Sequence, residues 1–139
     1  MVTLFDTSVL VAAHAQAHPQ FTWADAQVQA ATHPTICSHS LAEMYSVMTA
    51  HPQLRYPPAQ VQAVLESLTR NWTVTPLEPG DYLAAISRCQ ELNLPGGAIY
   101  DTLLAQAAVK INVSALVTLN PKHFVRLGDD IAALVVHPQ

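Results

Sequence analysis

The sequence predicts an α/β protein with a parallel sheet and helices on both faces of that sheet. Its 139 residues fit one domain of common size, so we expect a single domain over residues 1–139. Half of the residues are hydrophobic, which is enough for a sizeable core. Short apolar runs alternate along the chain with segments of helical periodicity, and this alternation is typical of βαβ units.

The first half of the chain changes repeatedly from apolar run to periodic segment. Residues 2–5 form a short apolar run that ends at polar residues, as a buried strand does. Helices are expected at 8–17 and 21–31, and a short strand at 35–37. In the helix that follows, four residues recur at the spacing i, i+3, i+4 and i+7, which predicts one apolar face. They are Leu41, Met44, Tyr45 and Met48.

The second half continues the same alternation, and prolines and glycines separate its elements. The expected elements are a helix with Val61, Val64, Leu65 and Leu68 on its apolar face, a strand at 72–75, a helix that begins at Pro79, a helix after Gly96-Gly97, a strand at 115–118, a short helix at 121–126 and a strand at 131–136.

Charge and cysteine content narrow the class of protein. The net charge of −4 excludes a protein that holds nucleic acid mainly by bulk positive charge, but not an enzyme that recruits cations to an acidic site. Cys37 and Cys89 match no metal or redox spacing and are expected to be buried thiols in a reducing compartment. We expect no membrane span, because no stretch of about 18 apolar residues occurs. The first ten residues carry no cation, so we expect a cytoplasmic protein without a secretory signal.

Acidic and amide side chains recur where predicted strands end or helices begin. Asp6 follows the first strand, Glu43 lies early in the helix after the second, and Asp101 lies early in the helix after Gly96-Gly97. Thr118 closes the strand at 115–118, and Asn120 follows it. In a parallel sheet the carboxyl ends of the strands share one edge with the amino ends of many helices. We therefore expect these residues to meet.

Three carboxylates at one edge constrain the chemistry of the site. Two of them about 5 Å apart repel each other by roughly 3 kcal/mol at an effective dielectric constant near 20. They therefore need protons or a counter-cation. Oxygen and amide ligands suit Mg²⁺ or Mn²⁺, and such an ion activates water and stabilises a phosphoryl oxyanion. The residues alone thus suggest metal-dependent phosphodiester hydrolysis.

Each acidic or amide residue also has a purely structural explanation. Asp6 would cap the helix that begins at Ser8. Glu43 stands three residues after Ser40, which is the spacing of a capping box. Asp101 would favour the positive end of its helix, and Asn120 would be an ordinary turn residue before proline. These explanations account for each residue singly but not for their common edge.

Further polar residues surround these positions. The hydroxyls of Thr7 and Ser8 would bond the ligating carboxylates, or merely cap a helix. His123 and Arg126 would contact a phosphate, or belong to a solvated helix face. The other six histidines have no ligand spacing and are expected at the surface.

Four segments together resemble the motifs of PIN-domain proteins, and most of all the VapC toxin branch of VapBC toxin–antitoxin modules. They are LFDTSVLVAA, SLAEMYSVMT, IYDTLLAQAA and LVTLNPKHF, in this order. The resemblance implies a three-layer α/β/α sandwich around a mainly parallel sheet of about five strands. It also implies Mg²⁺- or Mn²⁺-dependent cleavage of RNA, a homodimer, and a small antitoxin protein that inhibits the nuclease.

The resemblance also implies roles for individual residues. Asp6, Glu43 and Asp101 match the three family acids and would hold the ion. Asn120 stands where many members have a fourth acid, and we expect it to contact metal-bound water or substrate. Thr118 matches the family hydroxyl of its motif.

Two other functions stay open at this point. The first is a PIN-like module that binds RNA or protein with little or no catalysis, and the second is a housekeeping PIN ribonuclease without a toxin role. A phosphatase with an acidic nucleophile is disfavoured, because the second acid it needs two residues after Asp6 is replaced by Ser8.

Overall fold

Five parallel strands form the centre of the protein, as seen in a computed structural model that describes residues 1–139. The strand order is β3-β2-β1-β4-β5, and every neighbouring pair is parallel. The strands are β1 (Val2–Phe5), β2 (His33–Cys37), β3 (Thr73–Thr75), β4 (Ala115–Val117) and β5 (Val135–Val136). The helices are α1 (Thr7–Ala13), α2 (Phe21–Ala30), α3 (Ser38–Ala50), α4 (Pro58–Asn71), α5 (Pro79–Glu91), α6 (Ala98–Lys110), α7 (Pro121–Val125) and α8 (Asp129–Ala132).

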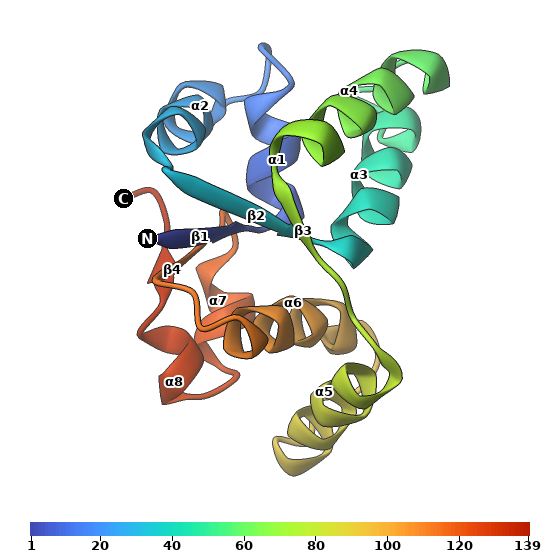
Figure 1. Ribbon diagram of the computed structural model, residues 1–139. Helices are drawn as coiled ribbons and strands as arrows, with labels where there is room; N and C mark the ends of the chain where they lie inside the picture. The colour runs from blue at the N-terminus through green and yellow to red at the C-terminus, as the bar shows by residue number, and fades with distance from the viewer.

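Helices cover both faces of the sheet, which confirms the predicted three-layer arrangement. Figure 1 shows α1 to α4 above the sheet and α5 to α8 below it. Neighbouring residues of one strand point to opposite faces, because side chains alternate along a strand. In β1, Phe5 packs into the core under α1 to α4, whereas Leu4 packs into the core against α6, α7 and α8. In β4, Val117 packs into the core under α1 to α4, and Leu116 packs into the core on the opposite face.

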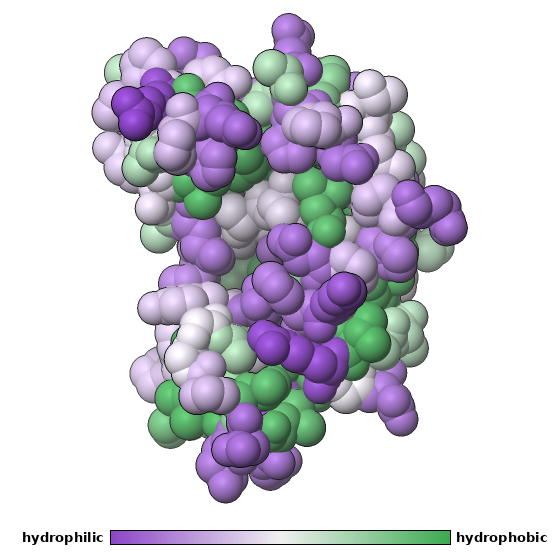
Figure 2. Space-filling model, turned by 180° about the vertical axis from the view of Figure 1, so that it is seen from behind, coloured by the Kyte–Doolittle hydropathy of each residue, from purple (hydrophilic) through white to green (hydrophobic).

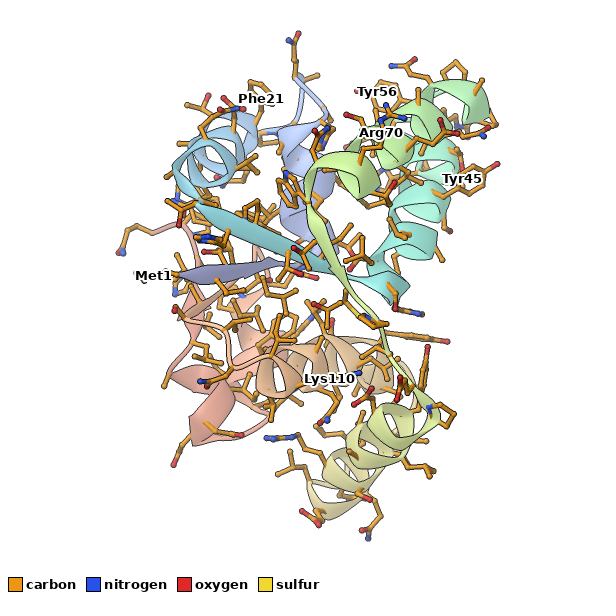
Figure 3. All side chains as sticks on the ribbon, viewed as in Figure 1. Met1, Phe21, Tyr45, Tyr56, Arg70 and Lys110 are labelled. Carbon is orange, nitrogen blue, oxygen red and sulfur yellow. The ribbon has the colours of Figure 1, made fainter.

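Helix α5 lies outside α6 and is held to the rest of the chain by two ion pairs. The Arg88 guanidinium donates to both carboxylate oxygens of Asp130, at 3.0 and 2.9 Å, and to the carbonyl of Leu127. At the other end, Lys110 Nζ donates to Asp81 Oδ2 at 2.8 Å, and Figure 3 shows the Lys110 side chain extending from α6. These contacts fix the outer helix against the layer that carries Asp101.

The structure corrects three predicted elements. Residues 131–136 do not form one strand, because Asp129–Ala132 is a helical turn and only Val135–Val136 pairs with β4. Helix α1 ends at Ala13 rather than at residue 17. Tyr45 does not belong to the buried face of α3, since 44% of it is exposed and Figure 3 shows it pointing away from the protein.

The strand order changes direction between β1 and β4. Chain connections lead from β1 towards β2 and β3 on one side, and β4 and β5 lie on the other. In open α/β sheets, ligands bind at the carboxyl edge beside such a switch point. No helix is both long enough and apolar enough to cross a membrane.

Candidate active site

A cavity of about 790 Å³ opens at the carboxyl edge of the sheet, beside the switch point between β1 and β4. Figure 2 shows one face of the protein hollowed near its middle, between an upper and a lower part. Seven of the predicted site residues are among the 19 that line the cavity: Asp6, Thr7, Ser8, Glu43, Asp101, Asn120 and His123. A second cavity of about 470 Å³ lies beside α1, α2 and α4, but no carboxylate lines it.

Asp6 lies between the ends of β1 and β4. Its backbone N–H donates to the carbonyl of Val117 at 2.9 Å, which joins the ends of the two strands. The residue is only 8% exposed, and its Oδ2 accepts hydrogen bonds from Ser8 Oγ at 2.7 Å and from Thr118 Oγ1 at 2.8 Å. Asp6 precedes α1, yet its carboxylate makes no capping hydrogen bond to that helix. Asp6 thus occupies the N-cap position of α1, but its carboxylate is directed to the two hydroxyls rather than to a standard capping bond.

Both hydroxyls also accept a hydrogen bond from a backbone N–H. Ser8 Oγ accepts from the N–H of Leu119 at 3.1 Å, and Thr118 Oγ1 accepts from the N–H of Asn120 at 2.9 Å. The backbone N–H groups use the hydroxyl lone pairs, so the proton of each hydroxyl is free to be donated to Asp6 Oδ2. One carboxylate oxygen thus accepts two donated protons, which is the arrangement that favours an ionised Asp6. Burial acts in the opposite direction and raises the pKa of Asp6, and the hydroxyls oppose that rise.

Glu43 reaches the same cavity from α3. Thr7 Oγ1 donates to Glu43 Oε1 over a long 3.4 Å, and His39 Nε2 lies 3.8 Å from the same oxygen. Burial, and then the negative charges of Asp6 and Asp101, raise the pKa of Glu43 to about 7. The predicted capping box is wrong, since α3 begins at Ser38 and the Ser40 hydroxyl is buried without any hydrogen-bond partner.

Asp101 lies in the first turn of α6, on the opposite side of the sheet from α3. Its Oδ2 is 3.4 Å from His123 Nδ1 of α7. Burial raises the pKa of Asp101, while the charges of His123 and Arg126 oppose the rise. Arg126 is exposed and does not line the cavity, so its influence on Asp101 acts through the electrostatic field alone.

Asn120 precedes α7 and lines the cavity with an exposed side chain. Pro121 occupies the first position of that helix, and the Asn120 side chain makes no capping hydrogen bond. Thr118 is fully buried behind Asp6 and does not line the cavity itself. Asn120 is therefore placed to meet a ligand, and Thr118 to orient Asp6.

The donor set fits a hard divalent cation. Each of the three acids carries a raised pKa, and the charge of Asp6 contributes to the rise in both Glu43 and Asp101. A bound cation would remove this repulsion, and carboxylate oxygens are the ligands that Mg²⁺ and Mn²⁺ prefer. No three His, Cys, Asp or Glu side chains are spaced as a preformed metal-binding group. The acids are thus close enough to raise one another's pKa, but their side chains do not form a complete coordination sphere for a metal ion.

Sequence patterns missed several residues of the cavity wall. His18 and His51 line it, although we expected them at the ordinary surface. Tyr100 lines it as well, and its ring stacks on that of His39, with the centroids 5.4 Å apart and the planes at 6°. Their positions in the sequence could have pointed to Tyr100 and His39, because Tyr100 directly precedes Asp101 and His39 stands one helical turn before Glu43.

Comparisons with known proteins give one family match and a shared fold. The sequence model of the PIN domain matches residues 3–129. A search of curated proteins finds no significant match.

Two solved structures share the fold of the chain. The first is VapC20 of Mycobacterium tuberculosis, described as a toxin that cleaves the sarcin-ricin loop. It has a TM-score of 0.69 and 13% identity, with 82% of this chain and 86% of that chain covered. The second is VapBC2 of Rickettsia felis bound to a DNA fragment from its promoter. It has a TM-score of 0.70 and 21% identity over 100% of both chains.

Proposed function

Because the chain belongs to the PIN-domain family, we propose that it is a Mg²⁺- or Mn²⁺-dependent endoribonuclease formed by a single domain over residues 1–139. The observation that carries the proposal is the convergence of Asp6, Glu43 and Asp101 in one cavity, each with a raised pKa. These residues come from opposite helical layers and from the end of the central strand, so no local structural role explains their meeting.

Asp6, Glu43 and Asp101 are the residues that hold the ion in this proposal. When bound, the ion lowers the pKa of a water molecule and stabilises charge on the phosphoryl oxygens. The protein contributes position and charge rather than a covalent nucleophile. Ser8 and Thr118 orient Asp6 through Oδ2, so that Oδ1 accepts no side-chain hydrogen bond and is available to the ion.

The remaining polar residues of the cavity act on the substrate. Asn120 offers an amide to metal-bound water or to a phosphate oxygen, and it adds no negative charge. His123, beside Asp101, donates towards a phosphate at the cavity wall. Arg126 lies outside the cavity and contributes only through its field. Cleavage by an in-line water leaves a 5′-phosphate and a 3′-hydroxyl.

We further propose that the chain is the toxin of a type II toxin–antitoxin pair, a homodimer inhibited by a small antitoxin protein. The likeness of fold to VapC20 and to the VapBC2 complex supports this assignment. Expression of the chain alone should slow bacterial growth, and coexpression of the neighbouring gene should restore it. Normal growth during expression of an active enzyme would instead indicate a housekeeping ribonuclease.

The catalytic proposal is tested by cleavage of a pool of single-stranded RNA in Mn²⁺ or Mg²⁺. We expect cleavage that EDTA abolishes and excess Mn²⁺ restores. Asp6→Asn should lower the rate by at least about 100-fold, since it removes the charge at the centre of the acid group, while circular dichroism shows the fold retained. A purified Asp6→Asn variant that cleaves at the wild-type rate would contradict the mechanism.

A binding module without catalysis is the second candidate, and two observations favour it. Asn120 replaces a potential fourth acid, and the acids do not form a preassembled metal group. This candidate predicts that the wild-type protein binds RNA or a protein but leaves RNA intact in Mn²⁺.

A further inference from the structure

The cavity that would receive RNA lacks the usual means of binding a polyanion. None of its 19 lining residues is Lys or Arg, and three of them are acidic. The whole chain has only 6 Lys and Arg residues and a net charge of −4. Electrostatic attraction to the phosphate backbone, which supplies most non-specific affinity in basic nucleic-acid-binding proteins, is therefore weak here. Apart from the bound ion and the lining histidines, the cavity must hold the nucleotides beside the reacting phosphate by uncharged contacts.

Stacking on an aromatic ring is such a contact, and the cavity wall carries two tyrosines, Tyr56 and Tyr100. Tyr100 is 52% exposed at the amino end of α6, and it directly precedes Asp101. Tyr56 also lines the cavity, but it is half-buried and packs against the core under α3 and α4. Tyr100 is thus the tyrosine of the cavity wall with a free surface next to the acids.

The Tyr100 ring already has a stacking partner. His39 stacks against it almost in parallel, with the ring centroids 5.4 Å apart and the planes at 6°. His39 is itself held beside Glu43, with its Nε2 atom 3.8 Å from Glu43 Oε1. His39 therefore covers part of one face of the tyrosine ring, and Tyr100 still exposes 52% of its surface to a further ring. A base that stacks there would extend an existing stack, at little further cost in side-chain entropy.

We propose that Tyr100 is a stacking platform for a nucleobase of single-stranded RNA next to the cleaved phosphodiester, and that His39 holds the ring of Tyr100 in place. This inference rests on the proposed ribonuclease function. It assigns to Tyr100 a role in substrate positioning, separate from the acids that hold the ion. Stacking is tolerant of sequence, so the platform provides affinity and register rather than recognition of one base.

The test uses a single-stranded oligoribonucleotide that the wild-type protein cleaves, with 2-aminopurine placed on either side of the scissile phosphate. Binding is measured in the Asp6→Asn background, where the RNA stays intact, and cleavage is measured with Asp6 present. We expect quenching of 2-aminopurine emission on binding when Tyr100 is present. Tyr100→Leu, which keeps an apolar side chain without a π face, should abolish the quenching.

Tyr100→Ala and Tyr100→Leu should raise Kd and KM by about 5- to 150-fold, the range that base–aromatic stacking gives by alanine substitution. The value of kcat should stay within about threefold, since the ion ligands are unchanged. Tyr100→Phe should bind as the wild type does, and His39→Ala should show a smaller loss than Tyr100→Leu. Tyr82→Ala is the matched control, because Tyr82 is 39% exposed on α5 and lies outside the cavity.

Each alternative result overturns the inference in a distinct way. Wild-type affinity in Tyr100→Leu would show that the tyrosine only stabilises the protein. A Tyr100→Phe variant as weak as Tyr100→Leu would assign the effect to the hydroxyl. If Tyr100→Ala fails to fold, two other results still test the inference. They are the 2-aminopurine quenching in the Asp6→Asn protein and the affinities of Tyr100→Leu and Tyr100→Phe. If wild-type protein cleaves no RNA in Mn²⁺, the proposed function fails and the stacking role fails with it.

Discussion

Asp6 is oriented by two hydroxyl groups that both donate to one of its carboxylate oxygens. Ser8 and Thr118 each accept a backbone N–H and donate to the same carboxylate oxygen of Asp6. Rotation of the carboxylate would therefore leave the protons of two buried or half-buried hydroxyls without their acceptor. In a site that holds an ion, such contacts set the direction of a ligand as well as its charge.

Thr118→Val tests this orientation, because valine keeps the shape of threonine without the hydroxyl. The substitution removes one donor to Asp6 and leaves the N–H of Asn120 without its acceptor. We expect RNA cleavage, or the affinity for Mn²⁺, to fall by about 10- to 100-fold, as is usual when a contact behind a metal ligand is lost. Cleavage assays across a Mn²⁺ titration measure both quantities.

The matched control for Thr118→Val is Thr49→Val on α3. Thr49 also loses a hydroxyl hydrogen bond, to the carbonyl of Tyr45, but it lies outside the cavity. This variant should cleave RNA at the wild-type rate. Equal rates for Thr118→Val and the wild type would mean that the Thr118 hydroxyl does not orient a functional carboxylate.

At the scale of elements, α3 begins without a capping side chain and buries a serine that has no partner. Ser40 is fully buried, and its hydroxyl makes no hydrogen bond. An unpaired buried hydroxyl destabilises the folded state, and alanine is the better helix former. We expect Ser40→Ala to raise the free energy of unfolding by about 1 kcal/mol, measured by chemical denaturation.

Ser46→Ala on the same helix is the comparison for Ser40→Ala. Ser46 is exposed, so its substitution changes helix propensity alone and should have an effect of about 0.5 kcal/mol or less. A loss of stability in Ser40→Ala would show that the buried hydroxyl has a partner, such as a bound water, and that its removal costs a hydrogen bond.

The same helix shows where sequence patterns succeed and fail at element level. The periodicity of α3 predicts a helix, and the structure confirms it, with Met44 and Met48 buried. The capping box fails because β2 turns directly into helix after Cys37, so that Ser40 already lies inside the first turns. A reciprocal capping box does exist on α5, between Glu78 and Asp81, where we predicted only the proline at the first position.

The prediction of a strand at 131–136 was wrong for a similar reason, because a local pattern does not show how the segment contacts the rest of the chain. An apolar run at 131–136 favours a strand, but two acids precede it and suit the positive end of a short helix. Asp130 pairs with Arg88, 42 residues away, and Gly128 adopts a φ of 141° that few residues other than glycine tolerate. The distant ion pair is invisible to a local pattern, so α8 was not predictable.

At the scale of the molecule, mutual repulsion among the acids links stability to pH and to metal. The pKa of Glu43 rises from 4.5 to about 7 in the folded protein, so the folded state binds its proton more tightly than the unfolded state does. Stability from this group is therefore greatest below about pH 4.5 and falls as the pH rises through about 7. The raised pKa values of Asp6 and Asp101 act with the same sign.

We expect the unfolding temperature of the wild-type protein in EDTA to fall more steeply between pH 5 and pH 8 than that of Glu43→Gln. Mn²⁺ should raise the unfolding temperature of the wild type more at pH 8 than at pH 5, because a carboxylate ligand must first lose its proton. Differential scanning fluorimetry measures both effects. Identical pH slopes for the wild type and Glu43→Gln would contradict the placement of Glu43 among these charges.

The fold and the common edge were predictable because topology decides them. A parallel sheet places strand ends and helix starts together, and that rule brings Asp6 and Asp101 into one cavity without any knowledge of side chains. The absence of Lys and Arg from the cavity wall and the stacking of Tyr100 on His39 were not predictable. They depend on which side chains of separate helices face each other, and no spacing along the chain encodes that.

The hydrogen bond between Thr118 and Asp6 joins residues 112 positions apart, at the ends of the neighbouring strands β1 and β4. A polypeptide still emerging from the ribosome has Asp6 long before it has Thr118, the N–H of Leu119 or the N–H of Asn120. The carboxylate then lacks the contacts that direct it, and β1 lacks its neighbour β4. If the chain degrades RNA, this order of synthesis delays cleavage until the segment that carries Thr118, Leu119 and Asn120 has been made.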